Sequence, residues 1–474
     1  ISLGTFRRAI LRLRSRLLHL GIGAGDTVCL IGLPRTSETL AIVVYAALAT
    51  VGVRVFFPMF VDRVALGRWL SDTRAKAVLW AAEEMACNGS EADGEWLVGL
   101  EDEVRQAGVP AHCIQKDLRV FEALTDSDTD TSESSAQAVI NELLTRGDAN
   151  DVSLITSITG NSGRARLVAY TLRALLNTCA SWEAAGFYSP SLLGGRGLCL
   201  LLAHSTGIAA FWNAVWTRQA LCLVPPEWFD EHPERVRDLL VSMAPAHVTG
   251  GPAGFYRLLE FTRVFPQIKD TFVRCLRCLV STGAAFDPVL SRGLEVTFKI
   301  PQHNAFEITE TMQVLSTLAP GPLACGPGDL GNPLPGVSVG LERIEGEGAG
   351  RHFRLWVRSP FAGAGTLADD GADGLTETGA SLPVIDHWYF SGDLVERTPH
   401  GGLRYVGRES DDFFKDGFGV RVSRPLLAER YAGLGEGVHH VEVFPLREEP
   451  GLAALVFVDG SVLGMKQPPA QGGW

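Results

Sequence analysis

The sequence predicts an α/β fold: a large N-terminal domain of mainly parallel sheets flanked by helices with a β-rich subdomain, then a small α+β C-terminal domain. From Gly25 onward, apolar strand-like stretches alternate with helical ones, which favours right-handed crossovers and a parallel sheet. Residues 340–406 replace this rhythm with short β-like runs separated by Gly- and Asp-rich loops. A charged joint at 407–415 precedes a short mixed tail, so we place the domains at 1–406 and 407–474.

The chain opens with an amphipathic helix. Apolar residues recur at steps of four and three, which is a helical spacing, and Gly21 ends the helix. The residues of this apolar stripe are Phe6, Ile10, Leu13, Leu17 and Leu20.

Strands and helices then alternate in two stretches of the chain. We expect strands at 27–33, 53–57, 77–80, 198–202 and 220–224, and helices at 37–50, 64–73, 172–185 and 211–218. Between the two stretches, residues 84–150 lose apolar periodicity, and neither Lys nor Arg occurs from Phe121 to Leu144. We interpret residues 84–150 as a solvated insertion.

Composition argues against several classes of protein. Of the 474 residues, 46 % are hydrophobic and 20 % are charged, a balance typical of globular chains. The formal charge of −12 argues against non-specific nucleic-acid binding. Polar residues interrupt the longest uncharged stretch, 197–217, so we predict no transmembrane segment. The nine cysteines show no pairing pattern, which predicts reduced thiols in a cytoplasmic protein.

The most informative segment runs from Ile158 to Arg166. Glycine and hydroxyl-bearing residues crowd its centre, where backbone N–H groups can turn toward an anion, and two arginines add positive charge. No Gly-Lys-Ser/Thr follows the glycines, so this is not the common nucleoside-triphosphate loop. The segment predicts a polyphosphate-binding loop. Its candidate binding residues are Thr159, Gly160, Asn161, Ser162, Gly163 and Arg166.

Further motifs follow this loop along the chain. They are His204-Ser205-Thr206-Gly207, Gly251 to Leu259, Ser281-Thr282-Gly283-Ala284-Ala285, Asn304 to Glu310, Ser391-Gly392-Asp393, and Gly407-Arg408 through Lys415. In this order, over residues 1–445, the chain resembles the adenylate-forming (AMP-binding) superfamily of acyl-CoA ligases, luciferases and peptide-synthetase adenylation domains. The loop aligns without a gap with that family's Thr-Ser-Gly-Ser/Thr-Thr-Gly-x-Pro-Lys-Gly, although Asn161, Ala165 and Arg166 replace the central Ser/Thr, Pro and Lys.

The resemblance implies ATP-dependent activation of a small-molecule carboxylic acid as an acyl-adenylate. The acyl group then passes to CoA or to the phosphopantetheine thiol of a carrier protein. The first step holds two anions in line and needs Mg²⁺ to gather their charge. Among the candidate catalytic residues, Glu310 would bind Mg²⁺, Thr309 would hydrogen-bond the α-phosphate, and Arg166 would neutralise phosphate charge with a more rigid group than Lys.

The resemblance also implies residues for the nucleotide and the acid. Phe306 would stack on adenine in place of the usual Tyr, and Asp393 would accept hydrogen bonds from both ribose hydroxyls. The remaining candidates are Gly283 and Ala284 along adenine, Arg408 at the ribose, and His204 and Gly207 beside the acyl pocket.

Two departures from the family pattern bear on activity. Glu307 stands where the family has Gly; pointing inward it would repel phosphate or recruit metal, and pointing outward it would be harmless. The family also carries a late Lys that bridges the carboxylate and the α-phosphate. This chain reaches Trp474 before that element is expected, which predicts a truncated C-terminal domain, and the context of Lys466 does not match. We therefore expect this chain alone to adenylate poorly.

Two alternative functions stay open. A catalytically weak or inactive binding module of the same fold is favoured by Asn161, Glu307 and the missing Lys. The retained residues that disfavour it are Thr309, Glu310, Asp393 and Arg408. A dinucleotide-dependent oxidoreductase fits the α/β rhythm, but no Gly-x-Gly-x-x-Gly follows the first strand. Candidate pocket elements at 211–216 and 283–285 are apolar with aromatics, which favours an aryl or aliphatic acid over an amino acid.

Overall fold

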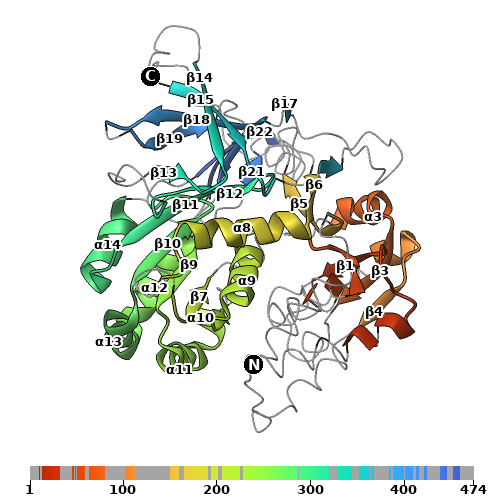
Figure 1. Ribbon diagram of the computed structural model, residues 1–474, viewed down its shortest axis with the longest axis horizontal. Helices are drawn as coiled ribbons and strands as arrows, with labels where there is room; N and C mark the ends of the chain where they lie inside the picture. The colour runs from red at the N-terminus through yellow and green to blue at the C-terminus, as the bar shows by residue number, and fades with distance from the viewer. Residues whose placement is uncertain are drawn as a thin grey trace, which may run out of the picture.

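The computed structural model of the chain contains two large sheets carrying helices and two short C-terminal hairpins (Figure 1). It describes residues 10, 13–15, 17–31, 45–46, 48–49, 51–58, 63–80, 102–113, 150–159, 165–189, 194–200, 205–224, 228–286, 288–319, 328–343, 352–362, 365–367, 384–385, 388–399, 401–408, 413–415, 421–423, 438–445 and 452–458. Within the predicted first helix, Ile10, Leu13 and Leu17 are buried, and Gly21 takes the left-handed φ of 73° expected at a helix end.

The first sheet is mainly parallel, in the strand order β16-β6-β5-β2-β1-β3-β4. Its strands are β1 (Thr27–Ile31), β2 (Arg54–Phe56), β3 (Ala75–Trp80), β4 (Ala111–Cys113), β5 (Val152–Thr159), β6 (Ala165–Thr171) and β16 (Gly365–Leu367). All pairs from β5 to β4 are parallel, whereas β5–β6 and β6–β16 are antiparallel. Helix α3 (Arg63–Asp72) packs on this sheet, where Trp69 meets Phe56 edge to face.

The second sheet has twelve strands, of which the five in one half of the sheet are parallel to one another. The parallel strands are β7 (Gly197–Cys199), β8 (Leu221–Leu223), β9 (His247–Gly250), β10 (Cys278–Thr282) and β11 (Gln302–Ile308). The helices between them are α9 (Ser205–Thr217), α10 (Trp228–Glu231), α11 (Pro233–Met243), α12 (Pro252–Val264), α13 (Pro266–Cys275) and α14 (Pro288–Phe298). Apolar faces of α10 to α14 form a second hydrophobic core against this half. The predicted parallel, helix-flanked architecture is therefore confirmed.

The same sheet continues as antiparallel strands in the order β11-β12-β13-β19-β18-β15-β14, with β17 paired to β18. These strands are β12 (Met312–Ser316), β13 (Asp329–Pro333), β14 (Ser338–Arg343), β15 (His352–Arg358), β17 (Val384–Ile385), β18 (Trp388–Arg397) and β19 (Leu403–Arg408). Gly331 allows the close approach of β13 to β12: its φ is 76°, and an added Cβ would collide with the backbone of Ser316 and Thr317.

Helix α8 (Leu172–Ala184) runs between the two sheets (Figure 1). Thr171 caps its start by accepting a hydrogen bond from the Ala174 N–H at 3.1 Å. Ser181 and Asn177 donate to the carbonyl oxygens of Pro335 and Pro360, at 2.7 Å and 3.0 Å. The helix thereby ties the antiparallel strands to the rest of the core.

Helix α9 begins at Ser205, earlier than the predicted start at residue 211. A glycine such as Gly207 lowers the stability of a helix by about 1 kcal/mol relative to alanine, so the local sequence favoured a loop here. Burial of Ile208, Ala209 and Phe211 against the core outweighs that cost.

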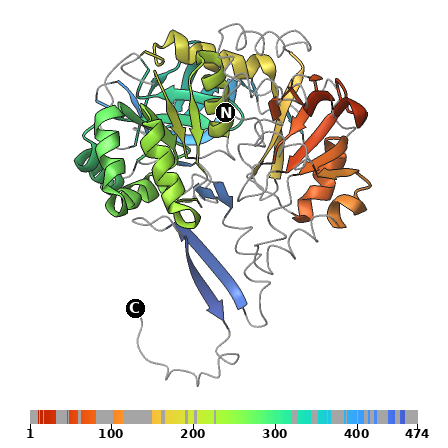
Figure 2. The same ribbon diagram turned by 90° about the horizontal axis from the view of Figure 1, so that it is seen from below.

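The C-terminal part contains two hairpins, β20 (Phe413–Lys415) with β21 (Arg421–Ser423), and β22 (Val438–Pro445) with β23 (Leu452–Val458). Figure 2 shows the β22–β23 hairpin extending away from the two large sheets. Among the helices that the structure describes, none is both long and apolar enough to cross a membrane.

Candidate active site

The turn between β11 and β12 carries Thr309 and Glu310. The two strands pair antiparallel with Ile308 opposite Met312, and the Thr311 N–H donates to the Ile308 carbonyl oxygen at 2.9 Å. Glu310 is only 3 % exposed, so its carboxylate is held inside the protein. A carboxylate buried this far requires compensation by hydrogen bonds, opposite charge or a metal ion.

Tyr170, on β6, fixes this turn to the first sheet. Its hydroxyl donates a hydrogen bond to the carbonyl oxygen of Thr309. Burial, and then the charges of Glu310, Glu307 and Tyr389, raise the pKa of Tyr170 well above its usual value, so the phenol stays protonated as a donor. No sequence pattern indicated this residue, because its partner lies 139 positions away in the chain.

The predicted phosphate loop connects two paired strands. β5 and β6 are antiparallel, with Thr159 opposite Ala165 and Ile158 opposite Arg166, so the backbone of both loop ends is placed by the first sheet. Four predicted binding residues lie outside the described residues: Gly160, Asn161, Ser162 and Gly163. His204, predicted beside the acyl pocket, also lies outside them.

The predicted adenine turn follows β10 at the carboxyl end of a parallel strand, where ligands of α/β sheets commonly bind. Gly283 takes a φ of 75°, and the Ser281 hydroxyl donates to the Ala284 carbonyl oxygen at 2.7 Å. β11 lies parallel to β10, with Ala305 opposite Thr282. The structure therefore brings the Gly283–Ala284 turn beside the strand that carries Phe306.

Asp393 and Arg408 are directly opposite each other on β18 and β19. Asp393 is 2 % exposed, and its backbone N–H donates to the Ser391 hydroxyl at 2.9 Å. For Arg408 the structure describes the backbone in β19 but not the side chain. The backbone thus juxtaposes the two residues that the resemblance assigned to the ribose.

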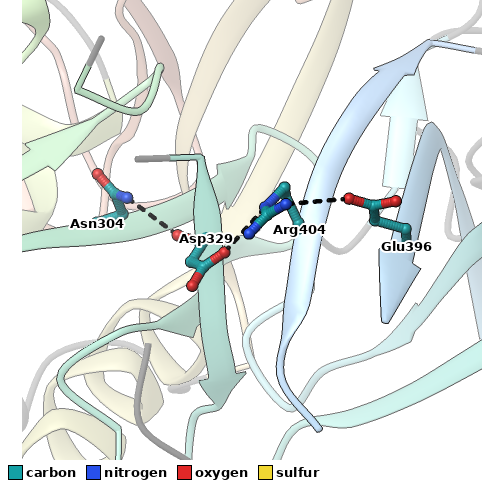
Figure 3. A network of polar contacts seen from close by, with 4 residues as sticks. All are labelled: Asn304, Asp329, Glu396 and Arg404. Atoms are coloured by element: carbon teal, nitrogen blue, oxygen red, sulfur yellow. Dashed lines mark hydrogen bonds and ion pairs between the residues drawn. The ribbon is translucent and has the colours of Figure 1, made fainter. Parts of the chain in front are cut away.

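A polar network links β11 to these strands (Figure 3). The Asn304 side-chain amide donates to the Asp329 carbonyl oxygen at 2.9 Å. Arg404 bridges Asp329 and Glu396, with N–O distances of 3.2 Å and 3.3 Å. Asp329 is 2 % exposed, so this pair is better shielded from solvent than a surface ion pair. No motif in the sequence indicated Asp329 or Arg404.

Glu307 points beneath α9. Its Oε2 accepts a hydrogen bond from the Thr206 hydroxyl at 3.0 Å, and the Thr206 and Thr282 hydroxyls are 2.9 Å apart. All three side chains are buried. Gly207, predicted beside the acyl pocket, is the next residue of α9. The carboxylate of Glu307 therefore contacts the first turn of α9, which carries most of the predicted acyl-pocket motif.

A cavity of about 40 Å³ lies between α9, the end of α8 and strands β7 to β9. One face of α9 lines it with Thr206, Ala210, Asn213, Ala214 and Thr217, so part of the predicted pocket element 211–216 faces this cavity. The predicted element 283–285 does not line it.

Glu310 is the only candidate metal ligand that the resemblance implied. In the described part of the chain, no group of three or more His, Cys, Asp or Glu residues could hold a metal ion. Mg²⁺ commonly binds through one or two carboxylates, taking its other ligands from substrate phosphates and water. A single buried carboxylate at the 309–311 turn fits such a metal when ATP is bound.

The helix-flanked parallel sheets, with candidate nucleotide-binding turns at the strand ends, agree with the fold of an adenylate-forming enzyme. The family model for the AMP-binding enzyme matches residues 1–365, and the chain belongs to that family.

Sequence and structure comparisons agree with this family. Anthranilate–CoA ligase of Pseudomonas aeruginosa is 29 % identical over 273 residues, a match that covers 54 % of this chain and 46 % of the relative, which is about half of each protein. The fold is similar to that of the amide bond synthetase McbA from Marinactinospora thermotolerans, with a TM-score of 0.70, 17 % identity, and 96 % and 84 % of the two chains covered. ATP-bound MatB from Rhodopseudomonas palustris gives a TM-score of 0.62, 19 % identity and coverage of 96 % and 82 %.

Proposed function

We propose that this protein activates a carboxylic acid with ATP and transfers the acyl group to a thiol. A carboxylate oxygen attacks the α-phosphorus of ATP as the bond to pyrophosphate breaks, which forms the acyl-adenylate. The thiol sulfur then attacks the acyl carbon, loses its proton, and AMP leaves. The observation that carries this proposal is the buried Glu310, held beside Thr309 on a turn that Tyr170 anchors to the first sheet.

The chain's own residues suggest which side chain binds each part of the substrates. Glu310 would hold Mg²⁺, which offsets the charge of the triphosphate, and Thr309 would bind the α-phosphate. Arg166 and the loop 159–163 would bind the outgoing pyrophosphate. Asp393, buried opposite Arg408, would accept hydrogen bonds from the ribose hydroxyls.

Phe306, on the strand beside the Gly283–Ala284 turn, would cover adenine. His204 and Gly207 would lie beside the acid.

The relative suggests an acceptor and a first substrate to test. Its name specifies CoA as the acceptor and anthranilate as the acid. The aromatic rings of Trp182 and Tyr188 line the cavity beside α9, which agrees with an aromatic acid. We propose CoA as the first acceptor, with carrier-protein phosphopantetheine as the second. Six cysteines among the described residues form no disulfide, which fits the proposed cytoplasmic location.

Calorimetric titration with Mg·ATP tests the nucleotide site without requiring turnover. Saturable binding is expected, and Glu310→Ala and Asp393→Ala should each weaken it about 10-fold or more, because each removes a charged partner of the ligand. Glu260→Ala, on the exposed face of α12, is the matched control and should bind as the parent does. Folded protein that does not bind Mg·ATP would refute the proposal and favour an inactive member of the family. Exchange of labelled pyrophosphate into ATP, with and without anthranilate, then tests the acid.

A further inference from the structure

Three charged side chains form a row across the antiparallel strands β13, β19 and β18 (Figure 3). Asp329 lies opposite Arg404 in the β13–β19 ladder, and Arg404 lies opposite Glu396 in the β19–β18 ladder. One guanidinium therefore holds a carboxylate on each neighbouring strand, at 3.2 Å and 3.3 Å. Hydrogen bonds between charged groups are strong and directional, so this row specifies which residues of the three strands lie opposite one another.

The β13 end of the charged row is tied to the predicted adenine turn. The Asn304 side-chain amide donates to the Asp329 carbonyl oxygen at 2.9 Å, and its oxygen accepts a hydrogen bond from the Phe286 N–H at 3.4 Å. Phe286 directly follows the turn at 281–285. These bonds hold β13 to β11 and to the adenine turn, and Arg404 extends the connection to β19 and β18.

A β-bulge separates the charged row from the residues assigned to the ribose. Between the row and the Asp393–Arg408 pair, β19 carries one extra residue, Val406, which lies opposite no residue of β18 in the described ladder. If the ladder continued from Arg404 without this bulge, Asp393 would lie opposite Gly407 instead. The bulge therefore decides which residue of β19 faces Asp393.

Local sequence specifies the register of this segment only weakly. Ser391-Gly392-Asp393 on β18 and Gly407-Arg408 on β19 are short of apolar side chains, and polar or glycine-rich strands are prone to slip in register. Gly392 also takes a φ of 74°, which is outside the extended region. A separate constraint on the register is needed, and the charged row on the far side of the bulge supplies one.

We propose that Arg404 is a positioning residue of the nucleotide site: it fixes the register of β18 and β19 on one side of the bulge, and so keeps Asp393 opposite Arg408. This inference rests on the proposed function and extends it to a residue outside the recognised motifs. The Arg404 and Glu396 side chains are 39 % and 30 % exposed, and a pair this accessible contributes little to stability. Loss of their contact should therefore change the register more than the folding.

Discrimination against nucleotides that lack the ribose hydroxyls reports this positioning. The probes are Mg·ATP and Mg·2′,3′-dideoxy-ATP, and the readout is the ratio of their Kd values from calorimetry. The parent protein should bind ATP at least about 10-fold more tightly, because sites built to hydrogen-bond a hydroxyl reject analogues that lack it. Arg404→Met should lower this ratio to about 3-fold or less, because a slipped register moves Asp393 away from the ribose. A merely structural role would weaken both nucleotides equally and leave the ratio unchanged.

A second variant and a control keep this test independent of folding. Arg404→Met alone takes the guanidinium away from a buried carboxylate, which can destabilise the fold. Asp329→Asn combined with Arg404→Met removes both charges and should give the same low ratio. Arg354→Met is the matched control, because Arg354 pairs with Glu342 at 3.0 Å in the same sheet, on the side of β18 away from β19. This control should keep the parent ratio.

Deletion of Val406 offers a rescue. Without the extra residue, an uninterrupted ladder from Arg404 already places Asp393 opposite Arg408. The deletion should therefore restore the parent ratio to the Arg404→Met variant.

The outcomes separate this inference from the proposed function. Equal binding of the two nucleotides by the parent, a parent ratio retained by Arg404→Met, or a low ratio that the deletion does not restore overturns the inference and leaves Mg·ATP binding intact. If the folded parent protein binds no Mg·ATP, the proposed function fails and the inference fails with it.

Discussion

Replacing Tyr170 by Phe tests whether the first sheet holds the 309–310 turn in place. The substitution removes one oxygen and leaves the buried ring, so it creates no cavity of methyl size. The carbonyl oxygen of Thr309 loses the phenol that donates to it. The hydrogen bond is part-buried, so losing its donor costs at most about 1–3 kcal/mol, which makes local opening of the turn up to about 5- to 150-fold more frequent.

Hydrogen exchange measures this opening directly. In peptides covering 302–316, the Thr311 amide, which donates to the Ile308 carbonyl oxygen, should exchange faster in Tyr170→Phe than in the parent. Mg·ATP should also bind more weakly, because Glu310 is held less firmly. Tyr405→Phe, at an exposed ring on β19, is the matched control and should change neither quantity. Unchanged exchange together with unchanged ATP affinity would refute the anchoring role of Tyr170.

Two further predictions concern stability. Gly331→Ala should destabilise the protein by about 3 kcal/mol or more, because φ is 76° and the added Cβ would collide with the backbone at the end of β12. Gly21→Ala, with a φ of 73° in open space, should cost only about 1–2 kcal/mol. Chemical denaturation measures both losses, and equal losses would contradict the close approach of β13 to β12. Lowering the pH from 7 to 5 should destabilise the fold by about 2 kcal/mol through His247. Burial disfavours the imidazolium and lowers the pKa of His247 in the folded protein to about 4, below the ordinary 6.5. As the pH falls, the unfolded chain therefore takes up the proton first. His247→Asn should flatten the pH dependence of the melting temperature, and His232→Asn, at an exposed position, should not. If the melting temperature depends on pH equally in the two variants, His247 is excluded as the source.

Local sequence patterns were enough to predict the fold class and the family. Alternating strand and helix periods predicted the parallel sheets, and the order of short motifs predicted an adenylate-forming enzyme, which the family model over residues 1–365 confirms. The motif at 281–285 also placed Gly283 in a turn, since a turn depends on a few neighbouring residues, whereas the turn that carries Thr309 and Glu310 came from the structure. Their roles in catalysis and nucleotide binding stay predictions until the binding experiments are done.

Contacts between distant segments could not be predicted in this way. The sequence left open whether Glu307 points inward or outward. Only the packing of α9 decided this, and it gave the carboxylate Thr206 as its partner, 101 positions away. Tyr170 and Arg404 lie in no recognised motif, and their contacts exist because two sheets and a chain of antiparallel strands meet.

The early start of α9 also depends on contacts between distant segments, because burial of its apolar face outweighed an unfavourable local sequence. The sequence by itself therefore determined the class of enzyme and the residues available to its site, since those depend on short-range patterns. The tertiary structure decided which buried polar groups face each other, because that depends on how the sheets and helices pack.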